Sequence, residues 1–123
     1  MTRGLNKVMV IGCTGRNPEM RYTPSGKSVA NFSLAYRHTW KDSTDETHHD
    51  TEWFNVIAWG KLAEFVKNKL QKGSLVYVEG RLQTRSWQDT EGNQKKTVEI
   101  VARDILILDE QQYHENRLES NGN

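Results

Sequence analysis

Four tryptophan side chains are the strongest candidates for binding chemistry in this chain: Trp40, Trp53, Trp59 and Trp87. Trp53 and Trp59 occupy one face of an alternating stretch, and Phe54 and Val56 occupy the other face. A core that takes the second pair leaves both tryptophans outside. A flat, rigid ring at the surface can stack on any nucleobase. The spacing therefore favours a face that binds single-stranded nucleic acid. The rings could instead form a second hydrophobic layer or an oligomer interface.

Basic side chains accompany one of these rings. Arg81 and Arg85 share a strand face with Trp87, because even separations place residues on one side of a strand. An arginine beside a stacking ring can hold the phosphate next to the stacked base. Lys67 and Lys69 lie on the polar side of a predicted helix, where solvated surface is the simpler interpretation.

The histidines form no motif typical of an enzyme. His48 and His49 are neighbours in a polar stretch, and adjacent residues in a loop do not prearrange a metal site. The chain has no HxH, HExxH, GxSxG, P-loop or GxGxxG pattern. We therefore predict a protein that is not an enzyme, with no metal and no cofactor. The rival hypothesis is a small hydrolase that uses the His48 and His49 loop.

Five stretches have the alternation or the β-branched content of strands: residues 5–13, 29–37, 52–59, 75–87 and 94–108. In the last stretch the alternation predicts one shared apolar face, made of Val98, Ile100, Ala102, Leu106 and Leu108. Residues 41–51 are polar and unpatterned, which predicts a loop that Trp40 opens.

Only one segment has helical periodicity. Leu62, Phe65, Val66 and Leu70 recur at i, i+3, i+4 and i+8, and Gly73 is a typical residue to follow a helix end. The predicted order is β-β-β-α-β-β. It indicates a mainly β fold, a five-stranded OB-fold barrel with one helix between strands 3 and 4. A mixed α+β roll is the rival with the same order.

Composition indicates one globular domain at 1–108 and a flexible C-terminal tail at 109–123. The chain has 123 residues, of which 35% are hydrophobic and 27% charged. Residues 1–108 hold 16 Lys and Arg against 12 Asp and Glu, and the tail holds one against four. A mildly basic body permits a polyanionic partner. The single cysteine and the short apolar runs exclude an intrachain disulfide and a membrane helix, so we expect a cytoplasmic protein.

The first strand predicts self-association. Residues 5–11 are apolar on both faces, and Met9 and Ile11 lie on the face that a barrel wall does not need to bury. A second copy of the strand could cover them, which would give an isologous dimer. Leu75 and Tyr77 form another apolar patch, which would allow dimers to pair into a tetramer. Alternatively, Met9 and Ile11 pack under the chain's own loops.

Over residues 3–108 the chain resembles bacterial-type single-stranded DNA-binding proteins, an OB-fold family. The order and spacing of its blocks carry the resemblance: residues 6–8 (NKV), 18–22 (PEMRY), 29–35 (VANFSLA), 51–53 (TEW), 59–64 (WGKLAE), 72–74 (KGS) and 76–82 (VYVEGRL), followed by Thr84, Arg85 and Trp87.

The resemblance implies a homotetramer that binds and protects single-stranded DNA, without sequence preference, in replication, recombination and repair at the nucleoid. The residues that match the family's stacking aromatics are the same four tryptophans. Phosphate contacts are implied for Arg3, Lys7, Arg21, Lys61, Lys72 and Arg85, with Arg81 added from its position beside Trp87. Subunit contacts are implied for Leu5, Lys7, Met9, Ile11, Phe54, Leu75 and Tyr77.

Two departures from the family pattern limit what is expected. Residues 119–123 lack the acidic tip, ending in Pro-Phe, through which the family docks replication and repair proteins. The sequence is therefore either a shortened form or a tailless relative, and it gives no support for docking through a tail, although replication and repair proteins stay possible partners. The acidic residues of 41–51 should repel phosphate, so we assign that loop no grip on DNA. An RNA or primosome-type OB module and a protein-interaction module remain as alternatives.

Overall fold

The structure is a computed structural model that describes residues 3–108. Its elements follow one another along the chain as β1 (Val8–Thr14), β2 (Glu19–Tyr22), β3 (Ser28–Lys41), β4 (Thr47–Trp59), α1 (Lys61–Lys69), β5 (Leu75–Gln88) and β6 (Gln94–Ile107). The predicted tail at 109–123 lies outside the described residues. Among residues 3–108, no helix is long and apolar enough to cross a membrane.

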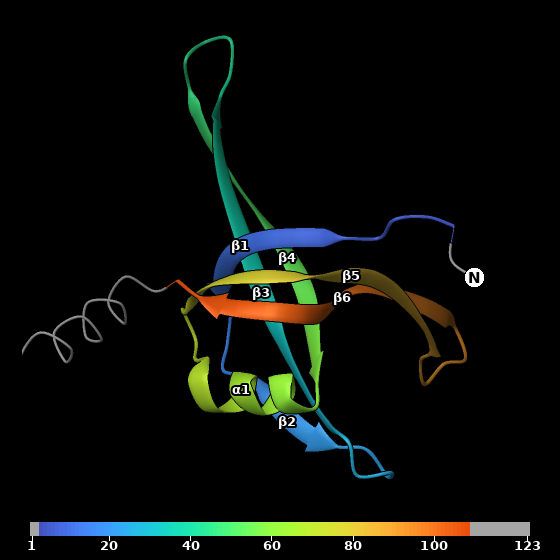
Figure 1. Ribbon diagram of the computed structural model, residues 1–123. Coiled ribbons are helices and arrows are strands. Elements are labelled where there is room, and N and C mark those ends of the chain that lie inside the picture. Colours follow the sequence, from blue (N-terminus) through green and yellow to red (C-terminus); the bar gives the residue numbers. More distant parts are fainter. Residues whose placement is uncertain (1–2, 109–123) are drawn as a thin grey trace, which may run out of the picture.

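The strands close into a barrel in the order β1-β5-β6-β4-β3, and β1 returns to pair with β3 (Figure 1). The β4–β6 pairing is parallel and the other pairings are antiparallel. β2 continues β1 along the same strand, since Cys13 pairs with Ala35 and Glu19 with Asn31. The barrel therefore has five strands, the first of them interrupted, and the predicted OB-fold is confirmed.

Alternation places the core where the sequence predicts it for β3, β4 and the start of β5. The buried side chains include Phe32 and Leu34 of β3, Val56 of β4 and Val78 of β5. Val66 of α1 joins this cluster, so the helix, which follows β4 and precedes β5 along the chain, covers one end of the barrel (Figure 1). The predicted helix is confirmed. Gly60, with φ of 63°, makes the turn from β4 into it in a conformation that favours glycine.

The predicted apolar face of β6 is wrong beyond Ala102. Glu79 pairs with Asp104 and Gly80 with Ala102, so Arg103 has no partner across the ladder. This β-bulge adds one residue and exchanges the two faces of the strand. As a result Ile105 is buried, whereas Leu106 is 57% exposed and Leu108 also faces outward.

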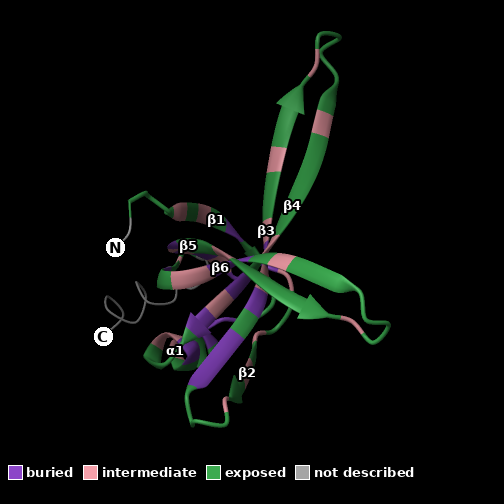
Figure 2. Ribbon diagram, turned by 90° about the vertical axis from the view of Figure 1, so that its right-hand side faces the viewer, coloured by how far each residue is buried: buried purple, intermediate pink, exposed green. Residues whose placement is uncertain are grey.

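Two long hairpins project beyond the barrel, and Figure 2 shows them as exposed arms. The β5–β6 arm carries Leu82 and Val98, which have core parity but are exposed because no second layer lies under the arm. The predicted loop at 41–51 is also largely strand. β3 and β4 pair as far as Lys41 and Thr47, which leaves only residues 42–46 in the turn. Because both faces of the arm are exposed, its residues do not alternate between apolar and polar, and the sequence pattern does not predict its strands.

Candidate nucleic-acid interface

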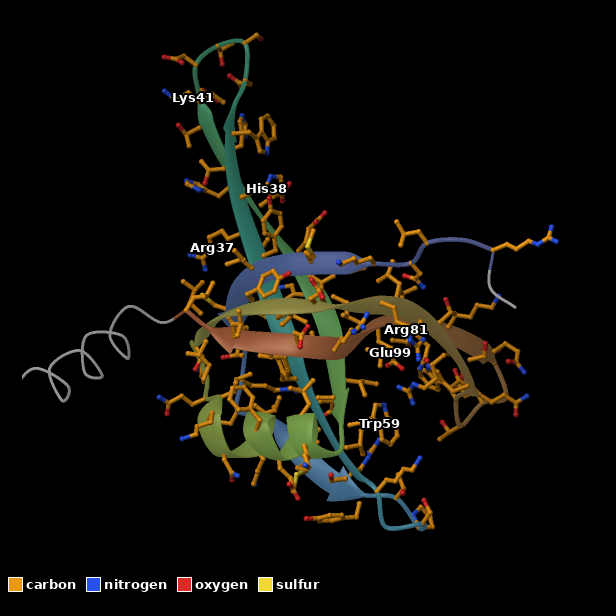
Figure 3. All side chains as sticks on the ribbon, viewed as in Figure 1. Arg37, His38, Lys41, Trp59, Arg81 and Glu99 are labelled. Atoms are coloured by element: carbon orange, nitrogen blue, oxygen red, sulfur yellow. The ribbon has the colours of Figure 1, made fainter. Side chains whose placement is uncertain are left out.

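A hollow of 370 Å³ lies on the outer face of the barrel, with walls from the β1–β2 link, β2, β3, β4, β5 and β6. Half of its lining residues are basic or amide side chains, and one is an indole: Arg16, Arg21, Thr23, Val29, Asn31, Phe32, Asn55, Ile57, Trp59, Gln83, Arg85 and Glu99. Figure 3 shows Trp59 and Glu99 on this side of the molecule, with Arg81 close to Glu99. We call this set of residues the hollow.

Two tryptophans of β4 stand on the face that leads to the hollow. Trp59 is 45% exposed and Trp53 is 62% exposed, whereas Val56 between them is fully buried. The predicted outward orientation of this pair is therefore confirmed. Trp53 lies against Gly15, where an added Cβ would come within 2.5 Å of the ring. A side chain at position 15 would therefore displace the indole from its present position.

Trp87 is held on the β5–β6 arm by a hydrogen bond. Its indole Nε1–H donates to Thr97 Oγ1 at 3.0 Å, and the ring is 42% exposed. The bond uses the only donor of the indole, so the remaining exposed surface of the ring is available for stacking.

Trp40 has a different setting, near the tip of the β3–β4 arm. Its ring stacks on the imidazole of His48, with centroids 4.3 Å apart and planes 17° apart. His48 Nε2 lies 2.8 Å from Asp42 Oδ2. Trp40 pairs with His48 and Trp59 with Val29, at opposite ends of the β3–β4 ladder. Eleven residues along β3 separate these positions, about 36 Å at about 3.3 Å per residue.

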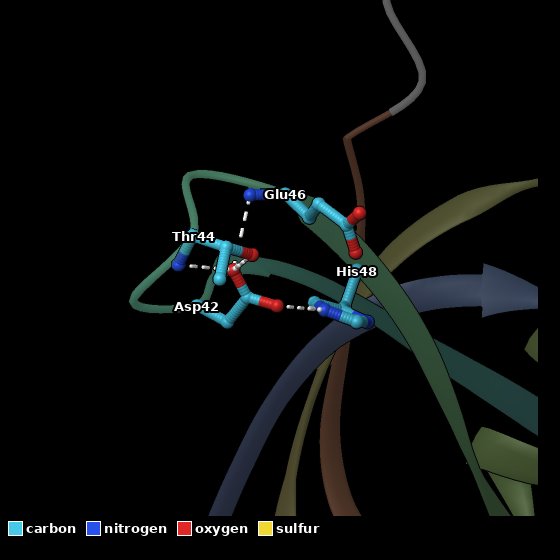
Figure 4. A network of polar contacts seen from close by, with 4 residues as sticks. All are labelled: Asp42, Thr44, Glu46 and His48. Carbon is cyan, nitrogen blue, oxygen red and sulfur yellow. Dashed lines mark hydrogen bonds and ion pairs between the residues drawn. The ribbon is translucent and has the colours of Figure 1, made fainter.

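A polar network closes the turn beside Trp40 (Figure 4). Asp42 Oδ1 accepts hydrogen bonds from the Thr44 hydroxyl at 2.6 Å, from Thr44 N at 2.9 Å and from Glu46 N at 3.0 Å. The Thr44 hydroxyl and His48 lower the pKa of Asp42 to about 2. Ligand-type atoms of Asp42, Glu46 and His48 lie within 4.8 Å of one another. The hydrogen bonds that close the turn are sufficient to account for the proximity of these three side chains.

Only some of the predicted phosphate-binding cations line the hollow. Arg21 and Arg85 do so, and Arg16 does as well, which sequence reasoning missed because it lies in the turn between β1 and β2. Arg81 is not among the lining residues, but its Nη1 donates to Oε1 of the lining residue Gln83 at 3.3 Å.

The other predicted cations lie outside the lining. Lys7 forms an ion pair with Glu79 at 3.6 Å. Lys72 is close to the β1–β2 link, where its backbone N–H donates to Asn17 Oδ1 at 2.8 Å. Arg3 and Lys61 are exposed at the start of the described chain and of α1. The contacts that these cations would make with a ligand stay predictions.

Four of the predicted interface residues, Met9, Ile11, Leu75 and Tyr77, share the outer face of β1 and β5. Ile11 pairs with Tyr77, and Tyr77 pairs with Leu106 of β6, so three apolar side chains form one row. Met9 is 62% exposed and Ile11 52% exposed, so no loop of the described chain covers them as the alternative required. Leu106 belongs to this face only because of the bulge at Arg103, and sequence reasoning missed it.

Three further predicted interface residues lie around this row. Leu75 is half-buried, as is its neighbour Tyr77 in the row. The Tyr77 hydroxyl donates a hydrogen bond to Glu79 at 2.9 Å. Phe54 packs against the core and lines a smaller hollow with Met9 and Ile11. Leu5 is almost fully exposed. Whether they contact a second subunit stays a prediction.

A closed five-stranded barrel with a basic hollow and projecting aromatic side chains defines the class of OB-fold nucleic-acid-binding domains. Residues 5–108 match the model of the single-strand binding protein family, and the chain belongs to that family.

Two known proteins illustrate the similarity. Single-stranded DNA-binding protein 1 of Chlorobaculum tepidum is 52% identical over 109 residues, which cover 88% of this chain and 67% of that protein. The solved structure of the Plasmodium falciparum SSB complex with ssDNA matches with a TM-score of 0.80 and 33% identity, covering 89% of this chain and 99% of that one.

Proposed function

We propose that the chain binds single-stranded DNA without marked base preference. The observation that carries this proposal is the hollow, where three arginines stand with Trp59. Trp53 is exposed on the same face of β4 as Trp59, and Trp87 is exposed on β5 two residues after Arg85. Membership of the single-strand binding protein family supports the same function. The named relatives, a single-stranded DNA-binding protein and an SSB complex with ssDNA, agree with it.

The chemistry divides between rings and cations. Each stacked base contributes about 1–3 kcal/mol whatever its identity, because every base has a π-face. Arg21 and Arg85 would neutralise phosphates, which carry no sequence information. Such contacts make binding weaken as salt rises, with a slope of about −0.7 per phosphate on a single strand.

The direct test is intrinsic tryptophan fluorescence during titration with oligo-dT at several salt concentrations. We expect strong quenching and a negative salt slope. A ribo-oligomer of the same length, added as competitor, separates DNA preference from general single-strand binding. Absence of quenching with every oligonucleotide at low salt would overturn the proposal and favour a protein-interaction module.

We further propose that the chain forms a homotetramer through the outer face of β1, β5 and β6. The exposed row of Ile11, Tyr77 and Leu106 supports this assembly, because an uncovered apolar face favours association. Four copies would give a long strand several linked binding faces and therefore avidity. Sedimentation at micromolar concentration should give about 57 kDa, four times 14.2 kDa. A stable monomer that binds long DNA tightly would contradict it.

The proposed biological role is protection of single strands during replication, recombination and repair, in the cytoplasm at the nucleoid. A binding function of this kind needs neither catalysis nor a cofactor. Replication and repair proteins are possible partners. Metal analysis together with a nuclease assay on the purified protein tests the hydrolase alternative at His48 and His49.

A further inference from the structure

We propose that Glu99 of β6 is a positioning residue that holds the arginines of β5 ready for phosphate, an inference that rests on the proposed function. A carboxylate is an unexpected group in a hollow that should attract a polyanion. Glu99 is nevertheless only 3% exposed and lies in the lining.

Glu99 contacts two side chains of the β5 face that carries Arg81 and Arg85. Its Oε2 lies 3.7 Å from Arg85 Nε, and its Oε1 accepts a hydrogen bond from Gln83 Nε2 at 3.3 Å. Gln83 Oε1 in turn accepts from Arg81 Nη1 at 3.3 Å. One buried carboxylate therefore restrains Arg85 directly and Arg81 through an amide.

Burial makes this arrangement specific. Burying a carboxylate is costly unless it is paired with a cation and hydrogen-bonded. Among residues 3–108, the side chains that partner Glu99 are Gln83 and Arg85. The Arg85 side chain is 56% exposed, so the buried group is the anchor and the exposed guanidinium is the group that it orients. Approach through Nε leaves the terminal nitrogens for a ligand.

Thr97 repeats the same geometry one step along β6. Arg85 pairs with Thr97 in the ladder and Gln83 pairs with Glu99. Thr97 accepts a hydrogen bond from Trp87, and Glu99 forms an ion pair with Arg85, so each reaches the β5 residue two positions beyond its own ladder partner. Thr97 and Glu99, which follow one another on the same face of β6, thus hold Trp87 and Arg85, which follow one another on the same face of β5.

The expected benefit is preorganisation. An arginine already restrained in the free protein loses less conformational entropy when it binds phosphate. A bare carboxylate with no such role would weaken binding through charge repulsion alone. The two explanations therefore predict opposite effects when the charge of Glu99 is removed.

The test is Glu99→Gln, which keeps the size of the side chain but puts an amide NH₂ where the carboxylate accepts. We expect affinity for oligo-dT to fall about 3- to 10-fold, although a negative charge has been removed from the site. The salt slope should become shallower by about 0.7 for each arginine released. Glu64→Gln, on the exposed side of α1, is the matched control and should change neither quantity.

A double-mutant comparison identifies the route of the effect. If Glu99 acts through Arg85, adding Glu99→Gln to Arg85→Ala should cost much less than Glu99→Gln costs alone. In the free protein, NMR relaxation of Arg85 Nε should show a restrained side chain, and this restraint should be lost in Glu99→Gln. Thr97→Val leaves the buried charge untouched and should weaken binding with a change in Trp87 emission, which Thr97→Ser restores.

The outcomes are distinguishable. Tighter binding by Glu99→Gln with an unchanged salt slope would overturn the inference, since Glu99 would then only repel phosphate. A lower melting temperature with unchanged binding would also overturn it, since the role would be structural. If Glu99→Gln does not fold, the wild-type protein decides: an Arg85 side chain as mobile by NMR relaxation as that of the exposed Arg37 would overturn the inference, and a restrained one supports it. Failure of the wild-type protein to bind any oligonucleotide would instead overturn the proposed function and this inference with it.

Discussion

The hollow and the tip of the β3–β4 arm each present a tryptophan with the same exposure but in opposite electrostatic surroundings. Trp59 and Trp40 are both 45% exposed. Trp59 lines the hollow with three arginines, whereas Trp40 stacks on His48, which contacts Asp42. Between residues 37 and 52 the arm has two Lys and Arg against five Asp and Glu. Ring exposure alone therefore does not define a site for a polyanion, because the charges around the ring decide whether phosphate can approach.

The largest expected effect comes from removing one ring from each region. Trp59→Ala should weaken binding to oligo-dT by about 1–3 kcal/mol, the contribution of one stacked base. Trp40→Ala should cost less at neutral pH, since acidic neighbours disfavour phosphate there. Fluorescence anisotropy with labelled oligo-dT measures both losses, and thermal melts report any change in folding. Equal losses would break the distinction between the two regions.

A glycine substitution tests the approach to the hollow without removing a ring. Gly15→Ala places a Cβ 2.5 Å from the Trp53 ring and 2.6 Å from Ser33 Oγ, so the indole must shift. We expect a loss of binding up to about 1–3 kcal/mol if Trp53 stacks a base. Gly4→Ala meets nothing within 4 Å and is the control. Unchanged binding together with a displaced Trp53 emission would remove this ring from the contact set.

Salt dependence separates the cations of the two regions. Arg85→Ala should reduce the salt slope by about 0.7, because one phosphate contact is lost. Lys41, which forms an ion pair with Asp45 at 3.8 Å near the arm tip, should give no change when replaced by alanine. The slope comes from titrations between low and moderate salt. A reduced slope in Lys41→Ala would show that the arm also binds phosphate.

The smallest expected effect concerns pH at the arm tip. The pKa of Asp42 is about 2 in the folded protein against an ordinary 3.8, so its contribution is complete above about pH 4 and disappears as pH falls through about 2. Asp42→Asn should abolish this acid dependence while oligo-dT binding at neutral pH changes little. The Trp40 emission against pH reports closure of the tip. A wild-type transition near pH 4 or above would contradict the lowered pKa.

Alternation predicts much of the fold because side chains in a strand repeat every two residues. It assigns Phe32 and Val56 to the core and Trp53 and Trp59 to the surface, and the barrel has all four where the pattern puts them. The helix is equally visible, since Leu62, Phe65 and Val66 mark one face of a 3.6-residue period. Prediction weakens where local pattern is absent, as in residues 47–51, which belong to an exposed arm and not to a loop.

The sequence by itself determined which rings could not enter the core, because parity along a strand is a local property of the chain. Only the tertiary structure decided what stands beside those rings. The bulge at Arg103, which turns Leu106 outward, depends on how β5 and β6 pair across the barrel. The joining of Arg16, Trp59 and Glu99 in one hollow depends on barrel closure, which brings together residues 40 or more positions apart. Strand register and closure are set by long-range packing, and no short stretch of sequence encodes them.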